Sequence, residues 1–561
     1  MSGHPLNGST RYSKLAVSLL LGIIIGSIST YRYWASGNVY VSSSVITSYK
    51  ARIALYFLIV AIFVAAASIF ILKWFSKGLS KPRELPFHRY AAMFVMIMVV
   101  WLAWIIPHYP GTMRDDSLVQ LFQWTGVCNF YDQHPLLTTV IFGAFWSLGD
   151  LLGIKEAGLF LYILVTALLA AATFVWGIRY FESRGMPQVW GWVAAVFFAC
   201  GRVIYQSIDA MSKDGLNSIF LVICFVLIFD AYYTKGKVLA SRKYVVALCI
   251  SAFLCMATKR TMLLVLVPVL LVAIICVDGR HAKLVATFVA VIPALVFQCV
   301  FSPLISLALG AAHTTTYEVW SLPVQIITRT IRDAPDTFSE AELEELSTSF
   351  DYTAAVQTYN PTRSDDVIWN IQVDGNKLLL VKYATLSAIR HPRLAVYAVG
   401  DMVDGWFAFD NNIDYGHNTY EELIAPEGRS STWQASYFER AEQTFKEFIS
   451  QYNFDWVFTR VAEFAESVDK ALASIPVVSS YGLYCAFIPL LVVANCLFFD
   501  RSKCSWFALM PALLFASVMV GPMTLYWYTS SFCYLAPFFL FAARFSSARE
   551  GDEGAAAMQT R

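Results

Sequence analysis

The residues of this chain best suited to chemistry lie in a polar stretch between two apolar segments, at residues 108–134. Asp115 and Asp116 are adjacent there, and His134 closes the stretch. A carboxylate can act as general base on a hydroxyl or amide, and an imidazole exchanges protons near neutral pH. Aspartate also caps helices by accepting free backbone N–H groups, which is the structural alternative for one of the pair. The stretch is therefore a candidate site for acid–base chemistry.

The residues after the two aspartates predict a short helix that lies flat on a membrane. Leu118, Leu121 and Phe122 fall at i, i+3 and i+4, which places them on one face. Asp115 and Asp116 then start the helix just outside the bilayer. His134 has three alternative roles: a phosphate-binding cation, a second acid or base, or a polar anchor at a helix entrance.

Three cations lie at the predicted exterior ends of apolar segments. Lys213, Lys259 and Arg260 oppose the usual enrichment of positive charge on the cytoplasmic side. A charge at the membrane edge is a functional hypothesis by default, and a phosphate leaving group needs such compensation. The alternatives are snorkelling to lipid headgroups, or for Lys213 an ion pair with Asp214.

Composition identifies the elements that must position these side chains. Of 561 residues, 57% are hydrophobic and only 14% are charged, which excludes an ordinary soluble protein. Hydrocarbon about 30 Å thick needs about 20 apolar residues per helix, and helices satisfy their own backbone in lipid. We therefore predict an all-α polytopic membrane protein with about 12–13 transmembrane helices. The apolar stretches are 14–31, 52–73, 89–107, 135–152, 156–178, 188–204, 215–233, 244–258, 261–277, 284–306, 476–499, 505–520 and 524–543.

The charges predict an orientation and a domain division. Residues 309–474 hold 25 acidic and 12 basic residues, whereas basic clusters near 73–89, 235–243 and 280–283 indicate the cytoplasmic side. The acidic segment then lies outside. The predicted divisions are 1–88, a tail and two leading helices; 89–307, a transmembrane core with the catalytic loop 108–134; 308–474, a mainly helical extracytoplasmic domain; 475–543, closing helices; and 544–561, a cytoplasmic tail.

One conflict arises in this topology. The loops at 108–134 and 205–214 are both predicted to lie outside, yet three apolar segments separate them, which is an odd number. Either one segment does not cross or one charge assignment is wrong. Residues 135–152 begin with Pro135 and end near Gly149 and Gly153, so we expect this segment to be short, tilted or re-entrant.

The order of several short motifs resembles the GT-C superfamily, the membrane glycosyltransferases that use polyprenyl-phosphate sugars, and is closest to a bacterial branch of unknown substrate. The resemblance covers about residues 90–540, and its motifs are individually short. They are Asp116-Ser117 with Gln120, His134-Pro135, Ser212-Lys213-Asp214, Lys259-Arg260, the stretch 323–329, Tyr359-Asn360-Pro361 with Asp365-Asp366, and His391-Pro392.

The resemblance implies a GT-C-like fold and assigns roles. It makes Asp116 the catalytic base, with Asp115 less favoured and Asp214 in the same cavity. Donor-phosphate or substrate contacts fall to His134, Lys213, Lys259, Arg260, Gln325 and Arg329. After Gly521-Pro522 the branch has an Arg-Tyr pair where this chain has Trp527-Tyr528, so the phosphate contact expected there must come from the other cations.

The implied reaction moves a sugar from a polyprenyl-phosphate-linked donor to an extracytoplasmic acceptor, which is a cell-surface glycan, lipid or protein. The site would face outward from a multi-pass protein of the plasma membrane, in contact with membrane lipid, with a divalent metal possible and no role for nucleic acid. The alternatives are a transporter or flippase of lipid-linked saccharide and an inactive sugar-binding scaffold. Transporters carry paired broken helices in matching halves, and no such two-fold pattern is visible in the sequence.

Overall fold

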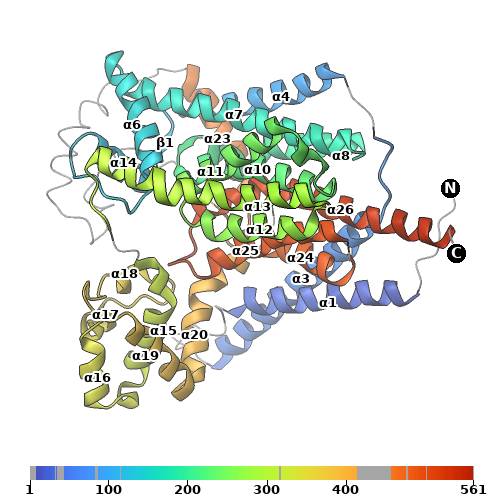
Figure 1. The fold of residues 1–561 in the computed structure, drawn as a ribbon. Coiled ribbons are helices and arrows are strands. Elements are labelled where there is room, and N and C mark those ends of the chain that lie inside the picture. The colour runs from blue at the N-terminus through green and yellow to red at the C-terminus, as the bar shows by residue number, and fades with distance from the viewer. Residues whose placement is uncertain are drawn as a thin grey trace.

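The computed structural model describes residues 8–31, 33, 43–82, 86–113, 115–314, 317–413, 457–475, 478–500 and 502–559. Within these ranges the chain is almost entirely helical, and the strands are β1 (Thr112–Met113) and β2 (Ala210–Met211). The predicted all-α class is confirmed. Most long helices run roughly side by side in one bundle, and a smaller helical domain lies at one end of it (Figure 1).

The bundle begins with helices from the first half of the chain. They are α1 (Gly8–Ser29), α3 (Ser43–Phe75), α4 (Phe87–Ile105), α5 (Asp115–Trp124), α6 (Leu136–Leu151), α7 (Lys155–Ser183), α8 (Gln188–Cys200), α9 (Arg202–Ile208) and α10 (Lys213–Tyr233). It continues with α11 (Arg242–Thr258), α12 (Met262–Cys276) and α13 (Arg280–Leu295), which runs through a π-helical turn into α14 (Ser302–Leu309). Four helices near the C-terminus complete the described part: α23 (Val457–Ala473), α24 (Ile488–Phe498), α25 (Leu509–Met519) and α26 (Ser530–Gln559).

Many bundle helices are apolar enough to cross a membrane. In the described residues six helices have the required length and composition, or seven if the bent pair α8–α9 counts as one span. Four further apolar helices are shorter, 10–17 residues each. The chain is therefore a helical polytopic membrane protein, while the expected number of 12–13 spans stays a prediction.

The smaller domain has its own hydrophobic core. It consists of α15 (Ser321–Asp333), α16 (Glu340–Ser347), α17 (Tyr352–Gln357), α18 (Asp365–Ile368), α19 (Leu378–Arg390) and α20 (Pro392–Val403). Tyr383, Leu346 and Phe350 are buried at its centre. A capping box between Ser339 and Glu342 starts α16, as the sequence pattern favours. The domain predicted for 308–474 is helical where it is described, and residues 414–456 lie outside the described part.

The two strands bear on the conflict between the loops at 108–134 and 205–214, which three apolar segments separate. β1 and β2 pair in parallel, so the loops that carry them lie at the same end of the bundle, which we call the strand end. At the opposite end Arg89 of α4 bonds Glu182 of α7. Thus α7 and the α8–α9 pair connect the two ends. Helix α6 packs on the first half of α7, with Phe142 against Tyr162, and has 16 residues against 29 in α7.

This arrangement predicts which side chains are reached from each side of the membrane. Asn129 and Lys237 are both exposed and lie near opposite ends of the bundle. Cysteine at position 129 should react with an impermeant maleimide added outside intact cells, and cysteine at 237 only after permeabilisation. A variant lacking Cys128 provides the background. Labelling of position 129 only after permeabilisation would place the strand end in the cytoplasm.

Candidate functional site

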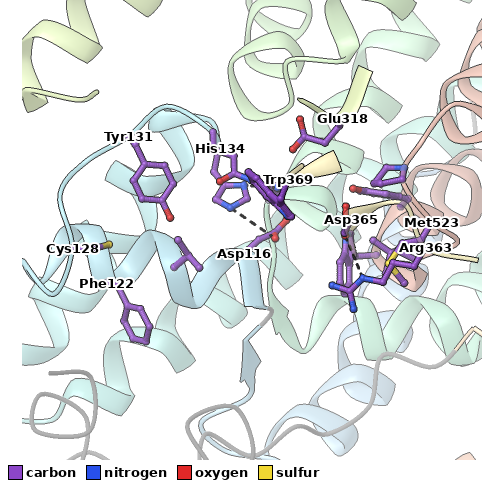
Figure 2. A pocket seen from close by; sticks show the side chains of 17 residues that line it. Asp116, Phe122, Cys128, Tyr131, His134, Glu318, Arg363, Asp365, Trp369 and Met523 are labelled. Atoms are coloured by element: carbon purple, nitrogen blue, oxygen red, sulfur yellow. Dashed lines mark hydrogen bonds and ion pairs between the residues drawn. The ribbon is translucent and has the colours of Figure 1, made fainter. Parts of the chain in front are cut away.

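A pocket of about 820 Å³ opens at the strand end, between the helix bundle and the smaller domain. Figure 2 shows Asp116 and His134 on one side of it and Arg363 and Asp365 on the other. The lining residues come from α5, the loop after it, the start of α10, the smaller domain and the segment before α26. They are Asp116, Val119, Phe122, Cys128, Tyr131, Gln133, His134, Lys213, Glu318, Arg363, Asp365, Trp369, Pro522, Met523, Leu525, Trp527 and Tyr528.

The paired strands bring the two central side chains together. Thr112 donates from its backbone N–H and its hydroxyl to the Asp209 carbonyl, which fixes the register. Helix α5 starts soon after β1, and α10 starts soon after β2 with Ser212 as its N-cap. Because the strands run in parallel, the chain continues in the same direction after both of them. The starts of α5 and α10, with Asp116 and Lys213, therefore lie close together.

A buried ion pair anchors the segment that leads into β2. The α8–α9 span bends by 54° at Gly201. Beyond the bend, Arg202 donates two hydrogen bonds to Asp469 of α23, at 2.9 and 3.0 Å. Tyr205 and Gln206 donate to the same carboxylate. Since a buried charge is tolerated when it is paired and fully hydrogen-bonded, this cluster holds α9 and β2 in place.

Lys213, Asp116 and His134 form the polar centre of the pocket. The Lys213 ammonium donates to Asp116 Oδ2 at 2.5 Å and to His134 Nδ1 at 3.0 Å. His134 Nε2 lies 3.9 Å from Asp116 Oδ1. Lysine only donates, so His134 Nδ1 accepts and the ring proton of the neutral imidazole is on Nε2.

The pKa values of Asp116 and His134 determine which of the two is charged. Burial alone would raise the pKa of Asp116, but the Lys213 ammonium and then His134 lower that pKa to about 2. Burial and the Lys213 charge lower the pKa of His134 to about 4, against the smaller opposing effect of Asp116. At neutral pH the cluster therefore holds an ionised Asp116 beside an uncharged His134.

The opposite wall comes from the smaller domain. Arg363 Nε lies 3.7 Å from one carboxylate oxygen of Asp365 and one of Asp366. Ser364, between them, donates from its backbone and its hydroxyl to the Pro522 carbonyl. Burial raises the pKa of Asp365 to about 6, because the opposing effect of Arg363 is smaller. This wall thus presents a carboxylate with a pKa close to neutral.

Other predicted residues surround the pocket without lining it. Asp214 is buried behind its neighbour Lys213 and accepts a 2.5 Å hydrogen bond from Lys259, whose ammonium lies 4.7 Å from the Tyr528 ring centroid. Arg260 pairs with Asp132 at 3.2 Å. The expectation of one cavity lined by Asp116, His134 and Asp214 is thus right for the first two and not for Asp214.

Two residues that were predicted to contact the donor phosphate or substrate do not line the pocket. Arg329 of α15 pairs with Asp333 and Asp401, inside the smaller domain. Gln325 is buried on the same helix and donates to the Asn360 carbonyl. The side chain of Asp115 lies outside the described part of the chain. The structure therefore brings together Asp116, His134 and Lys213, with Asp214, Lys259 and Arg260 around them.

Sequence reasoning missed most of the second wall. Glu318, Arg363 and Trp369 line the pocket, and nothing in their local spacing marks them. The Asp365-Asp366 pair was part of the resemblance but received no role. Trp527 and Tyr528, where the resemblance expects Arg-Tyr, line the pocket and bring an aromatic surface instead of a cation.

The donor set does not fit a divalent metal. Among the described residues, no three His, Cys, Asp or Glu side chains converge as metal ligands do. Asp116 and His134 approach each other, but the Lys213 ammonium already binds both. We therefore derive the chemistry of the pocket from its side chains alone.

The fold and the pocket define a helical membrane protein with a cluster of titratable side chains in a pocket at the end of its bundle. Residues 125–370 match a family of unknown function (DUF6020). No curated protein and no solved structure matches the chain significantly. The matched region includes His134, Lys213 and Asp365, and begins just after Asp116.

The site should depend on Gly111, which precedes β1 with φ +99°. A Cβ there would lie 1.9 Å from Cδ1 of the fully buried Ile163. Gly126 also has positive φ, +77°, but its Cβ would meet no atom within 4 Å. We expect Gly126→Ala to cost about 1 kcal/mol of backbone strain and Gly111→Ala more, because it adds overlap. Unfolding midpoints in detergent should differ accordingly, and equal midpoints would contradict this.

Proposed function

We propose that this protein is a membrane glycosyltransferase of the GT-C type. It moves a sugar from a polyprenyl-phosphate-linked donor to an extracytoplasmic acceptor, at the strand end of a plasma-membrane protein. The observation that carries the proposal is the Lys213–Asp116–His134 cluster on a pocket at the end of an apolar helix bundle. The fold resemblance to the GT-C superfamily is part of the same proposal.

Lys213 is the best candidate for the donor phosphate. Its side chain is 13% exposed and lines the pocket, whereas Arg329 is engaged in the smaller domain. A fixed ammonium stabilises the negative charge that develops on a leaving phosphate. Lys259 and Arg260 lie nearby, but each is paired with an aspartate that offsets its charge, so neither replaces Lys213 as the phosphate contact.

The pocket walls also suit an amphiphilic donor. Val119, Phe122 and Leu525 line the pocket together with the polar cluster, so an isoprenoid chain can enter along apolar surface while its phosphate reaches Lys213. Trp369 is 49% exposed and lies beside Asp365 on the second wall. An aromatic face of this kind can stack on a sugar ring.

The role of Asp116 follows from its partner. The resemblance makes it the general base, but a carboxylate with a pKa near 2 is a weak base while Lys213 remains bonded to it. A donor phosphate would compete with Asp116 for the Lys213 ammonium, which couples donor binding to this carboxylate. The assignment of Asp116 as the base stays a prediction.

Substitution of Lys213 tests the proposal. Lys213→Gln should weaken binding of a short-chain polyprenyl phosphate about 10- to 100-fold, because a hydrogen bond to a charged group contributes about 1.5–3 kcal/mol. Lys155→Gln is the matched control, since Lys155 pairs with Asp150 at 3.7 Å on the α6–α7 connection, away from the pocket lining. Affinity can be measured by thermophoresis in detergent.

Transfer of labelled sugar by the native protein is the second measurement. Reconstituted protein should move sugar from at least one polyprenyl-phosphate hexose to a cell-envelope acceptor. Movement of the donor across the bilayer without transfer would favour a flippase. If the native protein transfers no sugar and Lys213→Gln leaves the affinity for polyprenyl phosphate unchanged, an inactive scaffold is favoured.

A further inference from the structure

We infer that Asp365, on the second wall of the pocket, takes the proton from the acceptor during an inverting transfer, and that Asp116 positions Lys213. This inference rests on the proposed function and assigns its base to the smaller domain. It departs from the assignment that the resemblance implies.

The first argument is the geometry of displacement. In a single displacement with inversion, the leaving group and the attacking oxygen lie on opposite faces of the anomeric carbon, and the base stands beside the attacking oxygen. If Lys213 holds the phosphate, Asp116, 2.5 Å from its ammonium, lies on the leaving-group side. The base must then come from the far side of the sugar.

The second argument is which carboxylate is available. Asp116 already accepts a hydrogen bond from Lys213. The Asp365 side chain is 27% exposed, as is that of Asp116, but its ion pair with Arg363 in the described part of the chain spans 3.7 Å, which is longer than a hydrogen bond. The lone pairs of Asp365 are thus open to an acceptor hydroxyl, while Asp116 is engaged.

The third argument is that the wall is held in place. Two hydrogen bonds from Ser364 to the Pro522 carbonyl fix the residue before Asp365 against the segment leading into α26. Arg363 also pairs through its backbone with Met523. Asp365 is therefore held at the start of α18, and Figure 2 shows it at the pocket beside Arg363.

The charges around Asp365 support a proton affinity suited to a base near neutral pH. Burial is the main cause of its raised pKa, Arg363 opposes it, and three carboxylates reinforce it: Glu318 from the segment before α15, Asp366 from α18 and Asp116 from α5. Tyr528, in the segment before α26, also lies close enough to interact electrostatically with Asp365. A base is most effective when its pKa lies near the working pH.

The step balances as follows. Asp365 accepts the proton of the acceptor O–H or N–H, the freed electron pair forms the bond to C1 of the sugar, and the bond from C1 to the phosphate oxygen breaks. The phosphate leaves with that electron pair and is stabilised by the Lys213 ammonium. The configuration at C1 is inverted, and the proton later passes from Asp365 to water.

The test is the pH dependence of kcat/KM for transfer from a short-chain polyprenyl-phosphate hexose that the native protein uses. With Asp365 as base, the native rate should rise with pH through about 6 and then level, since Asp365 must be deprotonated. Asp365→Asn should remove this limb and lower transfer about 10²- to 10⁴-fold. With Asp116 as base, the rate would be flat above about pH 4.

Asp366→Asn is the matched control. Asp366 lies on the same helix at the same 3.7 Å from Arg363 but does not line the pocket, so its variant should keep the rate and the limb. The limb should move to a somewhat lower pH, because Asp366 is one of the carboxylates that raise the pKa of Asp365. Asp116→Asn should lower the rate yet keep that limb. A native limb near 6 that persists in Asp365→Asn, or product of retained configuration, would overturn the inference while leaving glycosyl transfer intact. No transfer by the native protein from any donor would overturn both.

Discussion

The ion pair between Lys213 and Asp116 is the interaction on which the rest of the site depends. Lys213 begins a helix whose residues are almost all buried in the bundle, so its charge must find a partner at the helix entrance. Removing an ionised group from water is costly unless a counter-charge and hydrogen bonds compensate it. Asp116 and His134 supply these in the described structure, and a ligand phosphate is the natural group to take their place.

The scaffold around this pair consists of interruptions in an otherwise regular bundle. The strand end contains a parallel pair of two-residue strands, a 54° bend between α8 and α9, and the short 16-residue helix α6. Irregular backbone at membrane depth is tolerated only where protein or a polar cavity satisfies it. Here the Gly201 N–H donates to the Phe197 carbonyl at the bend, and the Thr112 N–H donates to the Asp209 carbonyl between the strands. The irregular backbone lies next to the pocket.

Local sequence patterns predicted the first wall of the pocket and not the second. The apolar spacing of Leu118, Leu121 and Phe122 indicated α5, and those three side chains are buried beneath Asp116. The positions of Lys213 and Lys259 at the ends of apolar segments predicted that these cations lie near the site. The positions of Arg329 and Asp365 depend instead on how the smaller domain packs on the bundle, which short-range patterns do not encode. Residues 135–152 were correctly expected to be short: the helix has 16 residues, between Pro135 and the turn at Gly153.

In the proposed function, Lys213 binds the phosphate of a lipid-linked sugar. A structure of the reconstituted protein with a short-chain polyprenyl phosphate tests this most directly. We expect a phosphate oxygen within about 2.7–2.9 Å of Lys213 Nζ, with the Asp116 hydrogen bond loosened and the isoprenoid along Val119 and Phe122. A phosphate held at Arg329 in the smaller domain, or lying outside the pocket with the Lys213–Asp116 pair unchanged, would contradict it.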